Sequence, residues 1–273
     1  MPVDHYENFP VASWLLPQHL RKPIEIIYAF ARTADDFADE GTLPIEERFA
    51  LLDGYERELD LIECGGTSKL LLFQELAVTI KRHQLPLQEF RDLLSAFRQD
   101  VTKTRYADFD DVMDYCRRSA NPIGRLLLHL NCQAQTENLV RSDAVCSALQ
   151  LINHWQDVAV DWQKNVGGRV YLPLDDLARF GLSERDIASQ TSSAEWRNMM
   201  AFQCDRTRKM MLFGAPLGNI LHGRMGVELR VIIAGGIAIL DKIGAVHGDV
   251  FRHRPVMTKW DWLKIGPRAV YAI

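Results

Sequence analysis

Apolar residues recur at helical spacing along most of the chain, in long segments that glycine and proline separate. Pro23 suits the first position of a helix, where its missing amide would have no partner, so a helix is expected from Pro23 to about Asp39. Strand signals are nearly absent, and residues 168–173 are expected to form a short extended flap. The pattern predicts an all-α bundle, with further helices at about 46–61, 70–83, 87–100, 111–134, 142–164, 194–213 and 225–245.

Composition is that of an ordinary globular protein: 273 residues, 47% apolar, 25% charged and a net charge of −4. This length suits one large helical domain over residues 1–273. The basic residues are scattered, so nucleic acid is not an expected partner. The five cysteines form no C-x-x-C pair, which favours reduced thiols in the cytoplasm. We find no signal peptide and no uncharged apolar stretch of roughly 18 residues, so a membrane span is not expected, while peripheral contact with the inner membrane surface stays open.

One face of the first predicted helix carries four polar residues spaced four, three and four apart: Tyr28, Arg32, Asp35 and Asp39. Carboxylates at i and i+4 repel each other by a few tenths of a kcal/mol in an isolated helix. Arg32 can offset part of that charge, and a metal ion would offset more. Mg²⁺ commonly takes one or two carboxylates together with substrate phosphates. The stripe therefore indicates a cation site.

The same spacing returns in the second half of the chain, where one helical face carries Gln150, Asn153, Asp157 and Asp161. The other faces of this helix are apolar, so it should be largely buried, and buried carboxylates without partners are costly. One D-x-x-x-D alone is usually an ordinary solvated face. Its recurrence on an apolar helix favours two stripes that face each other across a carboxylate-lined cavity in the bundle core.

Together these two stripes resemble the paired aspartate-rich motifs of squalene and phytoene synthases, and Gly168–Pro173 resembles the flap that follows the second motif there. The resemblance runs from His5 to about Ile243. It implies a single-domain isoprenoid-synthase fold, the class I terpenoid synthase bundle, with a central cavity. Members of the family join two prenyl diphosphates head to head through a cyclopropyl diphosphate, which they then rearrange.

The resemblance also implies roles for individual residues. It places Mg²⁺, as two or three ions, on Asp35, Asp39, Asp157 and Asp161, with Asp36 as a neighbouring candidate. It places the diphosphate and its metals near His5, Tyr28, Arg32, Gln150 and Asn153. Lys164 and Arg169 could close over the same group, together with Tyr171 of the flap. Tyr115 matches a tyrosine close to the reacting carbons, and Phe9 is a candidate wall for a carbocation because aromatic faces stabilise positive charge.

Four positions depart from the common family pattern. Gln156 stands where relatives usually carry arginine, Trp162 where they often carry an acid, and Gly236 where tyrosine is common. Ser119–Gly124 replaces a more apolar stretch. With residues 5–10 and 155–161, these features resemble a bacterial branch of the family in hopanoid synthesis, the hydroxysqualene synthases. That branch takes presqualene diphosphate and adds water after diphosphate loss, and Asn121 could hold the water.

The sequence therefore predicts Mg²⁺-dependent conversion of presqualene diphosphate to hydroxysqualene, with diphosphate released and no NADPH required. Enzymes before and after this step in the pathway are the expected protein partners. One alternative is complete condensation of prenyl diphosphates to squalene or phytoene. Another is a prenyl-lipid-binding protein without catalysis, although such a protein would not need the metal ligands. A di-iron carboxylate bundle would need Glu-x-x-His pairs on facing helices, and we find none.

Overall fold

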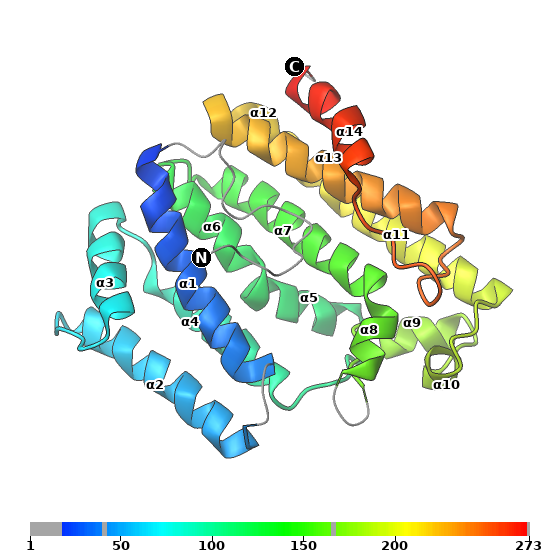
Figure 1. Ribbon diagram of the computed structural model, residues 1–273, viewed down its shortest axis with the longest axis horizontal. Helices are drawn as coiled ribbons and strands as arrows, with labels where there is room; N and C mark the ends of the chain where they lie inside the picture. The colour runs from blue at the N-terminus through cyan, green and yellow to red at the C-terminus, as the bar shows by residue number, and fades with distance from the viewer. Residues whose placement is uncertain (1–17, 40–42, 165–167, 272–273) are drawn as a thin grey trace.

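The computed structural model describes residues 18–39, 43–164 and 168–271, and for Asp39 and residues 266–271 it describes the backbone alone. These residues form a bundle of helices (Figure 1). In chain order the helices are α1 Gln18–Asp39, α2 Ile45–Glu63, α3 Leu71–His83, α4 Leu87–Asp100, α5 Phe109–Ser119, α6 Asn121–Leu130, α7 Thr136–Gln156, α8 Val158–Gln163, α9 Leu174–Arg179, α10 Glu184–Ala188, α11 Ala194–Gly214, α12 Leu217–Ile220, α13 Gly223–Ala245 and α14 Lys259–Tyr271.

The predicted all-α class is confirmed, since the described part of the chain contains no strand. The expected flap after α8 makes one isolated parallel bridge, between Arg105 and Val170. Its backbone also pairs at Val170 N with Thr104 O (3.0 Å) and at Leu174 N with Tyr106 O (3.0 Å). These bonds fix the flap against the segment between α4 and α5.

Three predicted helix boundaries were wrong. α1 begins at Gln18, so Pro23 lies inside the helix rather than at its start, and proline there removes only the bond to the carbonyl one turn earlier. The helix predicted at 111–134 is two helices that meet at Ala120, because Pro122 cannot continue the bonding of α5. The helix predicted at 142–164 starts earlier, at Thr136, and breaks at Asp157, where φ is −106° and ψ is 12°.

Two apolar cores hold the bundle together. The first core is formed by α1, α2, α3, α4, α6 and α12. At its centre is the fully buried Phe30, whose ring contacts those of Tyr55, Phe73 and Phe90 at centroid distances of 5.2–5.9 Å. The second joins α5, α7, α11 and α13 around Trp155. Trp155 is fully buried, and its indole N–H donates to Thr207 Oγ1 at 2.8 Å, so the ring is both packed and oriented.

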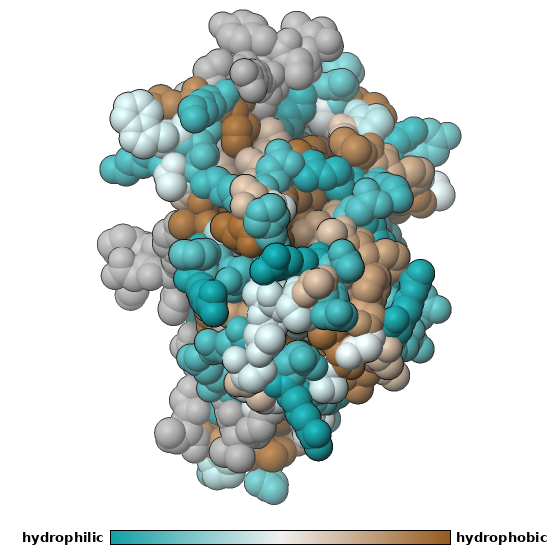
Figure 2. All heavy atoms as spheres, turned by 90° about the vertical axis from the view of Figure 1, so that its right-hand side faces the viewer, coloured by the Kyte–Doolittle hydropathy of each residue, from teal (hydrophilic) through white to brown (hydrophobic). Residues whose placement is uncertain are grey.

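The surface of this fold mixes polar and apolar side chains. On the face shown in Figure 2, teal hydrophilic residues are interspersed with brown hydrophobic ones. Within the described residues, no helix is both long enough and apolar enough to cross a membrane.

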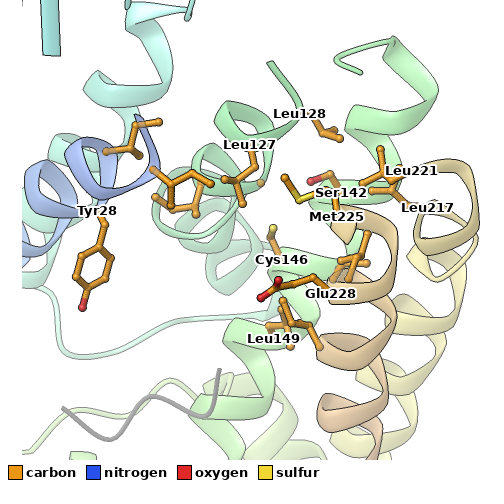
Figure 3. Close-up of a pocket in the computed structure, with 17 residues that line it drawn as sticks. Tyr28, Leu127, Leu128, Ser142, Cys146, Leu149, Leu217, Leu221, Met225 and Glu228 are labelled. Carbon is orange, nitrogen blue, oxygen red and sulfur yellow. The ribbon is translucent and has the colours of Figure 1, made fainter. Parts of the chain in front are cut away.

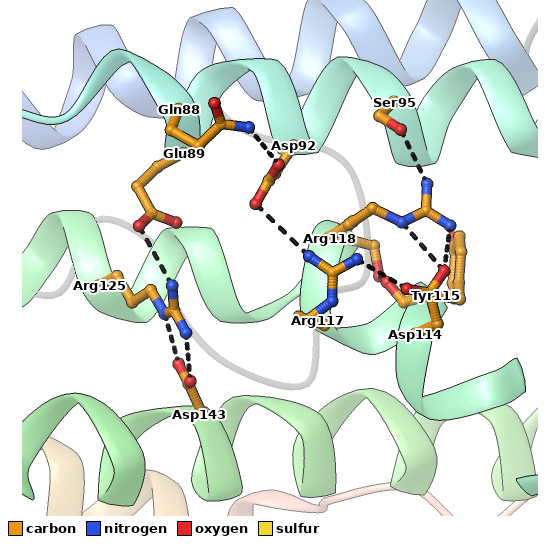
Figure 4. A network of polar contacts seen from close by, with 11 residues as sticks. Gln88, Glu89, Asp92, Ser95, Asp114, Tyr115, Arg117, Arg118, Arg125 and Asp143 are labelled. Carbon is orange, nitrogen blue, oxygen red and sulfur yellow. Dashed lines mark hydrogen bonds and ion pairs between the residues drawn. The ribbon is translucent and has the colours of Figure 1, made fainter. Parts of the chain in front are cut away.

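A chain of charged groups ties α4, α6 and α7 together (Figure 4). Arg125 of α6 forms a two-point pair with Asp143 of α7, with Nε–Oδ1 at 2.9 Å and Nη2–Oδ2 at 2.6 Å, and it reaches Glu89 of α4 at 3.4 Å. Glu89 is buried, and desolvation raises the pKa of its carboxyl although Arg125 acts in the opposite direction. Two acids therefore share one arginine, and Asp143 has the better geometry.

The two acids should contribute unequally to stability. Asp143→Asn should lower the free energy of unfolding by roughly 1–3 kcal/mol, because it breaks a charge-assisted pair at both oxygens. Glu89→Gln should change it by less than about 0.5 kcal/mol, since an amide oxygen can still accept from Arg125 and no buried charge is left. Urea unfolding at neutral pH measures both values. Glu137→Gln, at an exposed pair with Arg141, is the control; a larger loss for Glu89→Gln than for Asp143→Asn would contradict the ranking.

Candidate functional site

The two acidic stripes lie at the same end of the bundle. α1 and α7 run in the same general direction, and each carries its aspartates at or just beyond its C-terminal end (Figure 1). Residues about two turns earlier on each helix, Tyr28 of α1 and Leu149 of α7, line one shared apolar cavity. The expected carboxylate-lined cavity is not what the described residues form: none of Asp35, Asp36, Asp157 or Asp161 lines this cavity. These carboxylates pair instead with Arg32, Arg254 and Lys164 near the helix ends.

On the first stripe, Arg32 is close to two carboxylates. Its Nη2 lies 2.8 Å from Asp36 Oδ1 and its Nη1 lies 3.5 Å from Asp35 Oδ2. All three side chains are partly exposed, so they are accessible to a ligand. Asp36 is thus the nearer partner of Arg32, although the helical spacing singled out Asp35. The side chain of Asp39, and the predicted residues His5 and Phe9, lie outside the described residues.

On the second stripe, Asp157 occupies the break between α7 and α8. The backbone bonding nevertheless continues through it, from Asp157 N to Asn153 O (2.9 Å) and from Asp161 N to Asp157 O (2.8 Å). Both oxygens of Asp157 accept from Arg254, which lies between α13 and α14. Sequence reasoning missed Arg254, because the arginine is 97 residues away in the chain and belongs to no regular element.

The last acid of the stripe, Asp161, is buried and lies close to two basic residues. Lys164 Nζ lies 3.8 Å from the Asp161 carboxylate. The backbone carbonyl of Asp161 accepts a hydrogen bond from the backbone N–H of Arg169 at 2.8 Å. The predicted pair Lys164 and Arg169 is thus brought to the second stripe. Lys164 is exposed and Arg169 is buried, so only the lysine has the freedom to move over a ligand. Gln150 and Asn153 lie on α7, both partly buried.

Behind the second stripe lies a buried aromatic cluster centred on Asp100, the last residue of α4. Tyr115 O–H donates to Asp100 Oδ2 at 2.8 Å. Arg169 donates to the Asp100 carbonyl at 2.7 Å and to Tyr171 Oη at 3.1 Å. The structure thus brings together three predicted residues, Tyr115, Arg169 and Tyr171. It adds Asp100, which sequence reasoning missed because Asp100 ends a helix with an ordinary amphipathic pattern. Burial raises the pKa of both tyrosines, so their hydroxyls stay protonated.

His154 was also missed, although it follows Asn153 directly. Its ring stacks on Tyr171 with centroids 3.6 Å apart and planes 13° from parallel. Burial, followed by the charges of Arg169 and Lys164, lowers the pKa of His154 to about 3, so the ring is neutral at physiological pH. A charged imidazole here would face two cations, and the cluster therefore adds no further positive charge beside the acidic stripe.

The cavity itself is apolar and has a volume of about 280 Å³. α1, α6, α7, α12 and α13 supply its walls, which are mostly Ile, Leu, Val and Met. Figure 3 shows Tyr28 at the α1 side and the carboxylate of Glu228, from α13, between Cys146 and Leu149. Such a lining suits a hydrocarbon chain.

Two glycines allow close packing around this cavity: Gly124, which lines it, and Gly236, which stands where tyrosine is common in relatives. Gly124 permits close packing of α6 on α7, since a Cβ there would lie 2.4 Å from Ser142 Oγ and 2.5 Å from Cys146 Sγ. Gly236 lies against Met211, Ile152 and Leu149, at 2.9–3.3 Å from where a Cβ would be. The tyrosine common in relatives would therefore not fit at 236 without displacing its neighbours. Asn121 is buried, and its Oδ1 accepts from Ser147 Oγ at 2.8 Å.

The donor chemistry fits magnesium. The described carboxylates of the two stripes, Asp35, Asp36, Asp157 and Asp161, are hard oxygen ligands at or beyond the C-terminal ends of α1 and α7. Within the described residues no three His, Cys, Asp or Glu side chains form a ready-made metal cluster.

Comparison with known proteins identifies the family. The family model for squalene/phytoene synthase matches residues 3–261. The chain belongs to the squalene/phytoene synthase family. It is accordingly a squalene/phytoene synthase-type enzyme, and the family acts on prenyl diphosphates with a divalent metal.

Relatives and solved structures agree with this membership. The hydroxysqualene synthase of Rhodopseudomonas palustris is 40% identical over 233 residues, which is 84% of this chain and 76% of the relative. A 15-cis-phytoene synthase of Synechococcus elongatus is 30% identical over 268 residues, 93% of this chain and 85% of the relative. The crystal structure of squalene synthase HpnC from Alicyclobacillus acidocaldarius superposes with a TM-score of 0.82 at 37% identity, covering 89% of this chain and 90% of that one. The isoprenoid-synthase fold is confirmed.

The neutral state of His154 predicts an acid-dependent loss of stability. Because its pKa is lowered from 6.5 to about 3 on folding, the unfolded chain takes up a proton at this residue that the folded chain does not. Stability from this group is complete above pH 6.5 and is lost as pH falls towards 3, by up to about 1.4 kcal/mol per pH unit. His154→Phe, which keeps a ring on Tyr171, should flatten this slope in urea unfolding. Parallel pH curves for the two proteins would refute it.

Proposed function

We propose that this enzyme converts presqualene diphosphate to hydroxysqualene, releasing diphosphate in a Mg²⁺-dependent reaction of hopanoid synthesis. The observation that supports this most is an apolar cavity lined in part by α1 and α7, two helices that carry acidic motifs at or just beyond their C-terminal ends. A C30 hydrocarbon substrate needs the first feature, and its diphosphate needs the second. The similarity to proteins named hydroxysqualene synthase, at 35–40% identity, supports the choice of branch.

The diphosphate would be held at the acidic end. Asp35, Asp39, Asp157 and Asp161, with Asp36, would hold magnesium there, and bound Mg²⁺ supplies Lewis-acid neutralisation of the leaving diphosphate. Arg32 is already oriented towards this end by its pairs with Asp35 and Asp36, and a guanidinium suits phosphate oxygens. Lys164, exposed and one turn from Asp161, would add a mobile positive charge. Tyr28, Gln150 and Asn153 would complete the polar lining.

The carbocation left by ionisation needs walls that do not react with it. Tyr115 and Tyr171 would supply aromatic faces for this purpose, with their hydroxyls held by Asp100 and Arg169. Aromatic faces stabilise a cation by roughly 0.5–2 kcal/mol. His5 and Phe9, from the segment before α1, would contribute to the same enclosure. Exclusion of bulk water by the apolar lining would prevent early capture.

One water must nevertheless reach the cation if the product is an alcohol. We assign its placement to Asn121, whose carbonyl oxygen already binds the hydroxyl of Ser147. Asn121 and Ser147 form a small polar pair inside the packed interface of α6 and α7, where both side chains are buried. Such a pair can offer hydrogen bonds to one water without admitting more. We place the enzyme in the cytoplasm, in contact with the inner membrane surface where its C30 product would partition.

Substrate tests separate this proposal from its alternatives. The purified enzyme should be nearly inactive on farnesyl diphosphate alone and should turn presqualene diphosphate into an alcohol without any nicotinamide. Reaction in ¹⁸O-labelled water should put the label into the product hydroxyl, because water captures the cation. Efficient condensation of farnesyl or C20 diphosphates, or a hydrocarbon product that needs NADPH, would overturn the branch assignment and leave the family intact. Absence of Mg²⁺-dependent diphosphate release from any prenyl diphosphate would indicate a binding protein.

The metal role of the acids can be tested separately. Asp35→Asn and Asp157→Asn should each reduce turnover about 100-fold or more, because the amide fits the same space but supplies no anionic ligand for the Lewis-acid metal. Circular dichroism should show an unchanged helical fold. Near wild-type turnover in both variants would contradict the metal assignment, while loss of the fold would show that the acids are structural.

A further inference from the structure

The segment between α13 and α14 lies over the second acidic stripe. In Figure 1 this orange-to-red segment leaves the end of α13, approaches the junction of α7 and α8, and returns to α14. Two contacts join it to that junction. Arg254 donates to both carboxylate oxygens of Asp157, and the adjacent Pro255 carbonyl accepts from Gln156 Nε2.

Gln156 is well placed to control this segment. It precedes Asp157 directly, it is only 1% exposed, and its amide reaches across to the backbone of the segment rather than to a side chain. A bond to a backbone carbonyl fixes the chain itself. Pro255 restricts the backbone next to Arg254. The hydrogen bond that fixes the Pro255 carbonyl therefore also limits where the Arg254 side chain can point.

Further along, the segment is held from α13 as well. Lys242 Nζ donates to the Val256 carbonyl at 2.9 Å and pairs with Asp261 of α14 at 2.6 Å. Arg254 therefore carries an exposed side chain on a segment whose backbone is anchored at 255 and 256 by residues of two different helices. The arginine can release Asp157 without the segment having to move.

The arginine and a metal ion compete for the same atoms. A guanidinium that takes both oxygens of Asp157 uses the lone pairs that Mg²⁺ would take, and its charge repels a cation. The pair is partly exposed, with side chains 35% and 23% accessible, so it is a modest barrier rather than a permanent block.

We propose that Gln156 is a positioning residue: through the Pro255 carbonyl it holds Arg254 on Asp157, so that the free enzyme binds metal weakly at the second stripe. Metal then binds this stripe well only with the diphosphate, whose own negative charge offsets the arginine. This inference rests on the proposed role of Asp157 as a metal ligand. It also gives a physical reason for glutamine at 156: the amide contacts the segment without adding a second cation beside Asp157.

Mn²⁺ binding to the substrate-free, full-length protein tests this, with free Mn²⁺ measured by electron paramagnetic resonance. Arg254→Met should tighten binding about tenfold, since it removes both the competing pair and a positive charge. Gln156→Met, which keeps the volume of the side chain and removes the donor, should tighten binding about threefold. The double variant should match Arg254→Met alone, because Gln156 acts through Arg254.

Controls separate this inference from the proposed function. Gln74→Ala, on α3, removes a similar glutamine-to-carbonyl bond, to Ser68, and should leave Mn²⁺ binding unchanged. Asp157→Asn should weaken binding; if it does not, both the metal assignment and this inference fail. If Asp157→Asn weakens binding but Arg254→Met does not tighten it, this inference alone fails. Arg254 is exposed, so its variant tests the proposal even if Gln156→Met proves unstable. Additive effects of the two variants would show that Gln156 acts without Arg254, which also overturns the proposal.

Discussion

The constraint on which the rest of this structure depends is electrostatic: several carboxylates must lie near the ends of two helices that line an apolar cavity, without destabilising the bundle. Each is compensated locally. Arg32 lies against Asp35 and Asp36, Arg254 against Asp157, and Lys164 near Asp161. In the proposed reaction a metal ion and a diphosphate would replace these arginine and lysine side chains. The same ion pairs that compensate the carboxylates in the free protein would then set how strongly the ligand must bind.

α7 contributes to the apolar core, to the cavity wall and to the second stripe. One side of it is core, with Trp155 fully buried and bonded to Thr207 of α11. Another side lines the cavity, and its C-terminal end presents the second stripe. Its contact with α6 depends on Gly124, where a Cβ would overlap Ser142 and Cys146. Because it is held on several sides, α7 keeps Asn153 and Asp157 in fixed positions, and the backbone bonding continues through the break at Asp157 to Asp161.

Helical periodicity was enough to predict the all-α class, most helix positions and both acidic stripes, because these depend on local spacing. It failed at Pro23, Ala120 and Asp157, where helix ends depend on what packs against them. Residues of the site that come from elsewhere in the chain were also missed. Asp100 ends an ordinary amphipathic helix, and Arg254 is 97 residues from its partner, so neither has a local signal. The departures from the family pattern, at Gln156 and Gly236, could be identified from sequence, but their meaning required the neighbours that only the fold supplies.

Two of the differences from the family pattern remove a bulky or a charged side chain. Gly236 leaves no room for the tyrosine of relatives, since Met211, Ile152 and Leu149 already fill that space. Gln156 replaces a cation with a neutral donor that binds backbone. The neutral His154 adds no charge beside Arg169 and Lys164. Together they leave the positive charge near the second stripe on a few defined groups, Arg254 and Lys164 at the surface and Arg169 buried behind them. An enzyme that only ionises one diphosphate needs fewer fixed cations than one that must bind two diphosphates together. The charge distribution around α7 and α8 would therefore suit the single-substrate reaction proposed above.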